Sequence, residues 1–503
     1  MNKVKLTNSE RQILSNILDA FHANPFSDKR VTADRKIADF PPDATYTERY
    51  SKLVEAVTRS VNKLLSEGKG DIRKFEGKDH ILVEELFVFH VYNQYFLRFD
   101  PLIEKQLAEG DTPCKVSFAD EALGMIASFG FTPEEALHYF AIYFQLRRAY
   151  YFIRKGIIGN SPCMSNLREG LWNNVVTQDL ALYARKLWNR MEDYSTLLLG
   201  ETGSGKGVSA QAIGRSGYIP FDKKKGCFVE SFTRAFRSTN LSQFPEQLIE
   251  SELFGHTKGS FTGAVSNHDG ALSQCSRYGA IFLDEIGEVP VPVQIKLLHV
   301  LENRSYSPVG SHEKKRFPGR IIAATNRSLD DLRSERKFRD DFYYRLCSDV
   351  ILVPPLRQRI REDPVELDDL VIHTVKRIVG QESEDVALRV IREIHAQVPA
   401  DYAWPGNVRE LEQCIRRILL KQNYEIDRAA IAPADIEGRL INGVKAGSLD
   451  AQDLLSHYCV LLYNRHGSYE VVARKTALDR RTVKKYIDHG AGTKNASTSS
   501  GLK

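Results

Sequence analysis

The spacing of apolar side chains along the chain changes near residue 159. Before that point, the stretches 46–67, 81–107 and 132–153 repeat apolar residues at helical intervals, and the last two are rich in aromatic residues. The third stretch begins Thr132-Pro133 followed by two glutamates, a pattern typical of a helix N-terminus. We therefore predict that residues 1–158 are all helical.

Beyond residue 159, short apolar runs alternate with amphipathic stretches. The runs are Ser195-TLLLG, Ala280-IFLDE, Arg320-IIAAT and Asp349-VILVPP. Continuous apolar runs of this length are typical of parallel strands covered by helices on both faces. We predict an α/β subdomain at 159–355 and a helical subdomain at 356–440, followed by a glycine-containing linker, a compact helical segment at 449–489 and a disordered tail at 490–503.

Composition narrows the class of protein. The 503 residues carry 70 Lys and Arg against 65 Asp and Glu, a net charge of +5, which is too mild for a chain that coats nucleic acid throughout. The seven cysteines are scattered and form no CxxC pair, as expected for reduced thiols. No apolar run approaches a membrane span, and the charged N-terminus has no apolar signal segment. We expect a cytoplasmic protein of several domains.

A phosphate-binding loop follows the first apolar run. Its glycines allow main-chain N–H groups to surround phosphate oxygens at the start of a helix, and its lysine supplies a positive charge to the β- and γ-phosphates. The next residue is a glycine, where a Ser or Thr hydroxyl usually binds Mg²⁺. The predicted nucleotide-binding residues are Gly200, Glu201, Thr202, Gly203, Ser204, Gly205, Lys206 and Gly207.

Two acidic residues end the second apolar run, about 80 residues after the loop. A carboxylate at a strand end can hold Mg²⁺, and a neighbouring carboxylate can activate the attacking water. We assign the first role to Asp284 and the second to Glu285. Together with the loop, this pair predicts an ATPase that uses ATP and Mg²⁺.

Five segments then resemble one family in order and spacing. They are Glu250-SELFGHTKGSFTGA, Ile281-FLDEIGE, Arg320-IIAATN, Phe338-RDDFYYRL and Trp404-PGNVREL. Over about residues 159–440 the chain resembles the AAA+ domain of sigma-54-dependent transcription activators, also called bacterial enhancer-binding proteins, whose helical part is a lid. The hexapeptide Gly259-Ser260-Phe261-Thr262-Gly263-Ala264 resembles the family's sigma-54-contacting GAFTGA loop, with Ser260 in place of alanine.

The resemblance implies roles for further residues. Asn240 would pair with Glu285 and gate hydrolysis, Asn326 would be the sensor I residue, and Arg409 would be sensor II. Arg339 and Arg345 would reach the γ-phosphate of the neighbouring subunit, where a planar guanidinium can neutralise developing charge. An active site shared between subunits implies a homo-oligomeric ring, expected to be a hexamer.

The final helical segment contains a candidate DNA-binding element. The stretch SYEVVARKTALDRRTVKKYI predicts two short helices around a turn at 476–478, and it resembles the Fis-type helix-turn-helix that ends many of these activators. Polar side chains on its second helix are suited to base edges and phosphates. The predicted DNA contacts are Arg480, Arg481, Thr482, Lys484 and Lys485.

These features favour an ATP-driven transcription activator that binds DNA upstream of promoters and remodels sigma-54 RNA polymerase from closed to open complexes in the bacterial cytoplasm. Two alternatives are a repressor whose AAA+ domain only senses nucleotide, and an unfolding or helicase motor. The nearly intact hexapeptide argues against both, and the helix-turn-helix argues against a motor. The sequence leaves open the signal sensed by residues 1–158, the sign of their control and the target promoters.

Overall fold

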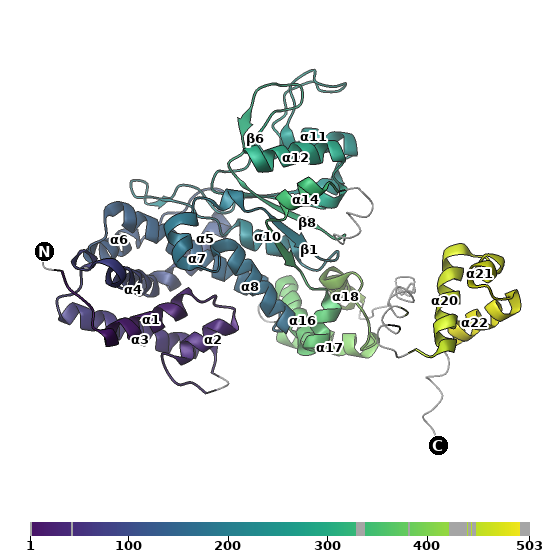
Figure 1. Ribbon diagram of the computed structural model, residues 1–503, viewed down its shortest axis with the longest axis horizontal. Coiled ribbons are helices and arrows are strands. Elements are labelled where there is room, and N and C mark those ends of the chain that lie inside the picture. Colours follow the sequence, from purple (N-terminus) through teal and green to yellow (C-terminus); the bar gives the residue numbers. More distant parts are fainter. Residues whose placement is uncertain are drawn as a thin grey trace. The chain divides into compact units, whose positions relative to one another are not determined.

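The computed structural model describes residues 3–41, 44–327, 338–380, 383–421, 440, 444 and 449–492. The chain divides into two compact units, Met1–Gln422 and Asn423–Lys503, coloured from purple to green and from green to yellow in Figure 1. The predicted linker and the end of the predicted lid lie largely outside the described residues, as does most of the predicted disordered tail. Among the helices that the structure describes, none combines the length and the apolar character needed to cross a bilayer.

Helices make up the N-terminal part of the first unit, as predicted. The described residues between 3 and 158 contain no strand, and Lys115 makes only an isolated bridge to Cys227. The α-helices are α1 (Asn8–His22), α2 (Asp28–Arg35), α3 (Tyr46–Ser66), α4 (Gly77–Tyr95), α5 (Phe99–Glu109), α6 (Ala119–Ser128) and α7 (Pro133–Gly156), with short 3₁₀ turns η1 (Ile72–Lys74) and η2 (Phe96–Arg98).

One predicted helix is divided in two. The stretch 81–107 was expected to be continuous, but α4 ends at Tyr95 and α5 begins at Phe99. Pro101 explains the break, because it has no N–H to donate to the carbonyl four residues earlier and its ring crowds that carbonyl. By contrast, α7 begins as predicted, with Thr132 and Glu135 forming a reciprocal capping box.

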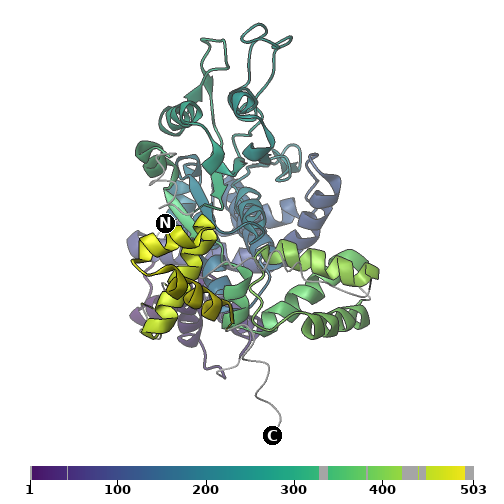
Figure 2. The ribbon, with the colours of Figure 1, turned by 90° about the vertical axis from the view of Figure 1, so that its right-hand side faces the viewer.

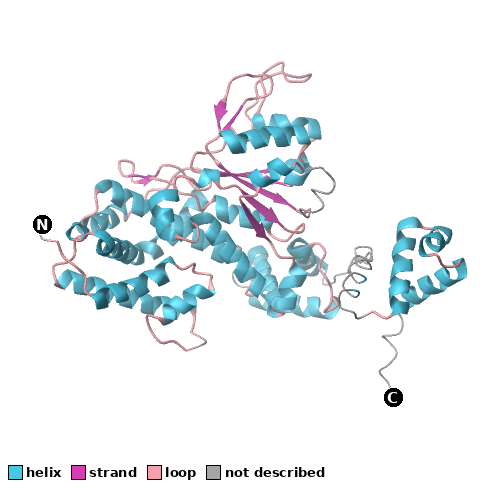
Figure 3. Cartoon of the chain, in the orientation of Figure 1, coloured by secondary structure: helices cyan, strands magenta, loops and turns pink. Residues whose placement is uncertain are grey.

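A parallel five-stranded sheet forms the centre of the first unit. Its order is β4-β5-β8-β1-β9, and each neighbouring pair is parallel. The strands are β1 (Thr196–Leu199), β4 (Phe236–Asn240), β5 (Ala280–Asp284), β8 (Arg320–Thr325) and β9 (Asp349–Leu352). Four of them match the predicted apolar runs. Figure 3 shows the strands in magenta between layers of helices.

The two faces of the sheet are buried in different cores, because successive strand residues point to opposite faces. On one face Leu198, Phe282 and Ile322 join a cluster that also contains the cores of α1–α8. On the other face Leu197, Ile281 and Ile321 pack with α11 (Glu246–Phe254), α12 (Val291–Asn303) and α14 (Asp340–Leu346). Helices α8 (Pro162–Val176) and α10 (Lys206–Gly214) therefore cover this face of the sheet, and α7 packs against both of them (Figure 1). The hydrophobic core is thus continuous across residue 158. The boundary at 158 stays a prediction.

Shorter elements and the lid complete the unit. On the α7 side lie α8 (Pro162–Val176), α9 (Leu180–Leu182), the π-turn η3 (Tyr183–Leu187), η4 (Met191–Asp193) and α10 (Lys206–Gly214). Elements outside the main sheet are β2 (Phe221–Asp222), β3 (Cys227–Phe228), β6 (Ser305–Tyr306), β7 (Lys315–Arg316), η5 (Leu241–Gln243) and η6 (Ile286–Glu288). Over its described residues, the predicted lid contains α15 (Leu356–Glu362), α16 (Val365–Val379), α17 (Glu384–Gln397) and α18 (Asn407–Lys421).

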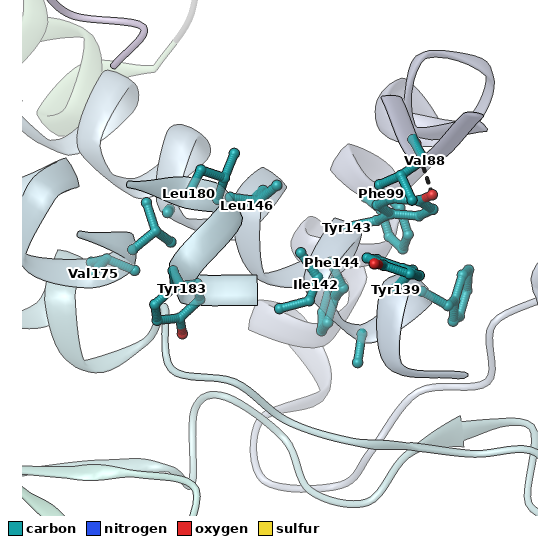
Figure 4. Packing of buried hydrophobic residues seen from close by; sticks show 14 of the residues in the cluster. Val88, Phe99, Tyr139, Ile142, Tyr143, Phe144, Leu146, Val175, Leu180 and Tyr183 are labelled. Carbon is teal, nitrogen blue, oxygen red and sulfur yellow. Dashed lines mark hydrogen bonds between the residues drawn. The ribbon is translucent and has the colours of Figure 1, made fainter. Parts of the chain in front are cut away.

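Helix α7 joins the N-terminal helices to the ATPase subdomain. Its aromatic residues pack into the shared core, where the Tyr143 hydroxyl donates to the carbonyl of Val88 at 2.8 Å (Figure 4). The fully buried Arg148 donates from Nη1 to the carbonyl of Arg215 and from Nη2 to that of Gly217, each at 2.6 Å. Arg215 caps the C-terminal end of α10, whose last carbonyls lack helical partners. Helix α7 therefore caps the helix that begins at the phosphate-binding loop.

In the part of the second unit that the structure describes, three helices form a small bundle. They are α20 (Ala451–His466), α21 (Tyr469–Thr476) and α22 (Arg480–Gly492), and their common core contains Cys459, Leu462, Val472, Val483 and Ile487. The turn lies where the sequence predicts it. Ala477 adopts φ 55°, and the N–H of Leu478 returns to the carbonyl of Ala473 at 3.2 Å.

Candidate ATPase site and loop

The phosphate-binding loop joins β1 to the first turn of α10. Lys206 is buried, and its Nζ donates to the carbonyls of Gly200 at 2.8 Å and Glu201 at 3.2 Å. Gly203 and Gly205 adopt φ of 78° and 113°, and a side chain at Gly203 would meet the carbonyl of Gly406. Gly203 and Gly205 are thus required by backbone conformation, and Gly203 also by the approach of the lid.

The two acidic residues face this loop from the end of β5. Glu285 adopts φ 56° immediately after the strand, and its N–H donates to Asp284 Oδ1 at 3.1 Å. Burial raises the pKa of Glu285, and the charge of Lys206 opposes that rise. Burial likewise lowers the pKa of Lys206, against the charges of Glu285 and Asp284. The loop lysine and both carboxylates therefore share one electrostatic environment, in which Glu285 is a stronger base than an ordinary glutamate.

The two predicted asparagines lie at the same edge of the sheet. Asn240 pairs in register with Asp284 across β4 and β5, and its Oδ1 accepts from the N–H and hydroxyl of Ser242. Asn326 follows β8 directly, and its Nδ2 donates to Thr202 Oγ1 at 3.0 Å. The main-chain N–H of Asn326 also lowers the pKa of Glu285. Parallel strands thus gather these residues, while pairing of Asn240 with Glu285 stays a prediction.

The donor set suits Mg²⁺ held mainly by the nucleotide. Mg²⁺ keeps several waters and binds proteins through one or two carboxylates plus substrate phosphates. Asp284 is only partly buried and sits beside the loop, whereas Gly207 offers no hydroxyl. Among the described residues, no group of three or more His, Cys, Asp and Glu side chains could form an all-protein cage.

The lid contacts the loop through residues that the sequence analysis missed. Asn407 adopts φ 54°. Its Nδ2 donates to Glu201 Oε2 and to the carbonyl of Thr202, both at 3.1 Å. Its Oδ1 accepts from the N–H of Leu356 at 2.8 Å. Arg357 forms a two-point ion pair with Glu201, one contact being 2.7 Å. The position of Asn407 inside the Trp404–Leu411 segment was the signal available in the sequence.

Arg409 differs in placement from Arg345 in α14 and from Arg339, the residue that precedes this helix. The Cβ of Arg409 lies against Gly203, and the charge of Arg409 acts on Lys206. Arg339 instead pairs with Asp341 at 2.7 Å, and Arg345 donates to the carbonyl of Leu301 at 3.2 and 3.3 Å. Arg339 and Arg345 are both exposed. Arg409 therefore lies beside the phosphate-binding loop of its own chain, whereas Arg339 and Arg345 bond elsewhere.

The hexapeptide 259–264 forms a closed, exposed loop. The N–H of Gly259 donates to the carbonyl of Ala264 at 2.8 Å, and Gly259 and Gly263 adopt φ of 80° and 103° with open space around them. Phe261 is 37% exposed and contacts the ring of His256 edge-on, and Thr262 is exposed. The loop presents an aromatic ring and a hydroxyl to solvent.

A second loop supports the first, which the sequence analysis did not anticipate. Thr257 donates from its N–H to the carbonyl of Val309 at 3.0 Å, and a side chain at Gly310 would overlap the Cβ of Ser260. Residues 305–316 thus form a β6–β7 hairpin beside the hexapeptide. Figure 2 shows these two loops extending together beyond α11 and α12.

The predicted DNA contacts lie on one helix of the second unit. Arg480, Arg481, Lys484 and Lys485 are exposed on α22, and Asp479 accepts from the N–H groups of Arg481 and Thr482 at its start. Arg480 also pairs with Glu470 at 2.9 Å. Helix α22 therefore presents four exposed basic residues in two turns.

Comparison with known proteins identifies the central modules. Residues 175–351 match the Sigma-54 interaction domain, and residues 361–448 match the AAA+ ATPase lid domain. Nitrogen fixation protein AnfA of Azotobacter vinelandii is 34% identical over 336 residues, covering 66% of this chain and 57% of AnfA. The transcriptional regulatory protein GlrR of Escherichia coli K12 is 35% identical over 288 residues, covering 57% of this chain and 56% of GlrR.

Two further similarities complete the comparison. The DNA-binding transcriptional regulator NtrC of Azospirillum brasilense is 36% identical over 280 residues, covering 56% of this chain and 51% of NtrC. The crystal structure of NtrX from Brucella abortus with ADP is 18% identical, with a TM-score of 0.40 over 75% of this chain and 80% of NtrX. The sequence matches thus span little more than half of each relative. The chain therefore carries a Sigma-54 interaction domain and an AAA+ ATPase lid domain, and in these modules it is homologous to sigma-54-dependent activators such as NtrC, AnfA and GlrR.

Proposed function

We propose that this protein is an ATP-driven transcription activator that contacts sigma-54 through the loop 259–264 and converts closed promoter complexes to open ones. The observation that carries the proposal is the coexistence of an assembled ATPase site with an exposed, glycine-flanked loop that belongs to neither the phosphate nor the carboxylate cluster. Such an activator acts in the bacterial cytoplasm, where RNA polymerase transcribes.

Each residue at the sheet edge has a role in hydrolysis. Lys206 binds the β- and γ-phosphates, and the loop N–H groups orient them. Glu285 takes a proton from the attacking water, a role supported by its raised pKa. Asp284 would hold Mg²⁺, which neutralises charge on the phosphates. Asn326 and Arg409 would report the state of the nucleotide to β8 and to the lid.

A ring explains the two exposed arginines. In one subunit Arg339 and Arg345 bond to Asp341 and to the carbonyl of Leu301, away from the phosphate-binding loop. A homo-oligomer, expected to be hexameric, would place them against the γ-phosphate of the next subunit. Each hydrolysis event would then be sensed across an interface.

DNA binding is assigned to the second unit. Helix α22 follows a tight turn after α21, the arrangement of a helix-turn-helix whose second helix enters the major groove. Its exposed Arg480, Arg481, Lys484 and Lys485, with Thr482, suit phosphates and base edges. Binding upstream of promoters would raise the local concentration of the ring near polymerase.

Replacing Thr262 by alanine is expected to leave ATP hydrolysis largely intact while it weakens sigma-54 binding and promoter opening. ATP turnover should stay within about threefold of wild type, while capture of sigma-54 with a trapped transition-state analogue falls at least about tenfold, because Thr262 touches solvent and no part of the ATPase site. The measurement pairs sigma-54 capture with ATPase and promoter-opening assays on one preparation. Ser266→Ala, an exposed change outside the loop, is the matched control. Normal capture and promoter opening by Thr262→Ala would refute the activator proposal.

Replacing Gly207 by serine is expected to reduce the Mg²⁺ concentration for half-maximal ATPase by about two- to tenfold, the range of one added polar contact. A Cβ at this position meets no atom within 4 Å, so the hydroxyl can be added without strain. Gly207→Ala adds the carbon without the hydroxyl and serves as the control in the same Mg²⁺ titration. Equal responses of the serine and alanine variants would show that the hydroxyl does not bind the metal.

A further inference from the structure

A cavity of about 300 Å³ lies among the N-terminal helices, remote from the ATPase site. Its walls come from α2, α3, α4, α7 and α8, and they are mainly aromatic: Tyr46, Tyr50, Phe89, Tyr92, Tyr150 and Trp172. We name it the aromatic cavity. Its volume falls at the lower end of the range for small-molecule sites, which are largely apolar with a few polar groups.

Two arginines also line the aromatic cavity. Arg30 is 4% exposed, and its guanidinium lies over the rings of Tyr46 and Tyr50 at 5.6 and 5.7 Å. Arg147 lies over the ring of Tyr150 at 5.3 Å. A cationic ligand would meet these like charges, so the cavity does not suit an ammonium group, although aromatic walls alone would.

Among the described residues around the cavity, the guanidinium groups outnumber the carboxylates by one. Arg147 forms a two-point pair with Asp100, one contact being 2.7 Å. Asp34, in contrast, accepts from both Arg30 at 2.8 Å and Arg49 at 3.3 Å. In the described part of the chain, three guanidinium groups thus share two carboxylates. Arg30 Nη2 is buried and has no hydrogen-bond partner among the described residues. A buried donor and an excess buried charge are costly unless a partner of opposite charge is supplied.

We propose that the aromatic cavity binds a small planar aryl carboxylate. Its ring would stack among the tyrosines, its carboxylate would pair with Arg30, and the excess charge would be neutralised. Burial raises the pKa of Tyr46 to about 12, so its phenol remains a protonated donor. Burial also keeps the pKa of Tyr50 well above its usual value, and the Tyr50 hydroxyl donates to Asn93 Oδ1.

Helix α7 connects this cavity to the phosphate-binding helix. Arg147 and Tyr150 line the cavity, while Gln145 and Arg148 donate to the carbonyls of Ser216, Arg215 and Gly217 after α10. A ligand that shifts α7 therefore changes the cap of the helix that begins at Lys206. This regulatory part of the inference rests on the proposed ATPase function, whereas binding does not.

The binding test uses the full chain and three matched probes: benzoate, neutral benzyl alcohol and cationic benzylamine. Calorimetry should show benzoate binding at least about tenfold more tightly than benzyl alcohol, as expected for a hydrogen bond to a charged group, and no binding of benzylamine. Equal affinities for benzoate and benzyl alcohol would overturn the proposal, as would preference for benzylamine or no benzoate binding up to about 10 mM.

Variants then locate the site. Arg30→Met should weaken benzoate binding at least about tenfold and spare benzyl alcohol. Arg49→Met removes the excess charge but leaves Arg30 to pair with the carboxylate, because Arg49 does not line the cavity, so it should weaken benzoate binding by less than Arg30→Met does. Ala23→Phe fills the cavity without touching Asp34 and should abolish binding of both. Equal losses in Arg30→Met and Arg49→Met, or wild-type binding by Ala23→Phe, would contradict the assignment.

The regulatory arm compares ATP turnover with and without benzoate. Turnover of wild type should change on saturation, and turnover of Ala23→Phe should not. Binding without any change in turnover would refute transmission through α7. A chain with no ATPase activity at all, yet with the expected binding selectivity, would refute the proposed function instead.

Discussion

Glu285→Gln subunits are expected to bind ATP with wild-type affinity and to hydrolyse it at least about a hundredfold more slowly. Glutamine preserves the shape of the side chain but cannot accept a proton from water. Glu285 is the group at this sheet edge whose pKa burial raises, which makes it the stronger base at the reacting water. Lys206→Ala should already fail to bind ATP, because it loses the positive charge that binds the phosphates.

Nucleotide binding by fluorescence and phosphate release measure the two steps separately. Glu288→Gln is the matched control, because Glu288 is an exposed acid three residues further along and changes the net charge equally. Hydrolysis by Glu285→Gln at the wild-type rate would show that the catalytic base lies elsewhere.

Arg345→Ala is expected to reduce ATP turnover by about a thousandfold while leaving nucleotide binding intact, the magnitude typical of a lost arginine finger. The arginine bonds to the carbonyl of Leu301 in its own subunit and would act on the next. An exposed arginine outside the predicted set, Arg361, gives the control substitution Arg361→Ala.

Mixing the two inactive proteins tests action across the interface. An interface between an Arg345→Ala subunit, which keeps Glu285, and a Glu285→Gln subunit, which keeps Arg345, contains neither defect. In an equal, random mixture roughly a quarter of the interfaces should be active, because the head-to-tail contact is directional. No recovery on mixing, or full activity of a diluted monomer, would refute a shared site.

The central strands were predictable because burial on both faces leaves an unbroken apolar run. Ile281 and Phe282 face opposite cores, so every position of β5 must be apolar until Asp284. Strand β4 was missed because it lacks this burial. It lies at the edge of the sheet, and its sequence Phe236-Arg-Ser-Thr-Asn240 is mostly polar, so it forms no apolar run. Its place is set by pairing with β5, which local sequence does not encode.

The site residues that follow one another in the sequence could be predicted. Those that reach the site through contacts between distant segments could not. The loop at 200–207 and the acids at 284–285 follow apolar runs directly. The bonds of Asn407 to Glu201 and Thr202 join residues more than 200 positions apart. The sequence also left open whether the clustered aromatic residues of the N-terminal helices line a ligand pocket or fill a core, because tyrosine and phenylalanine on helices have the same spacing in both cases.

The cap that α7 places on α10 has a consequence for genetics. A chain beginning at residue 159 would lose Arg148 from the end of α10 and expose Phe228, which stacks on Phe144 at 4.0 Å. Deleting the N-terminal helices would then damage the ATPase subdomain itself. Loss of activity in such a deletion would therefore not show that these helices stimulate the ATPase. Selection for signal-independent activity should recover point substitutions along α7 and the walls of the aromatic cavity, and very few truncations.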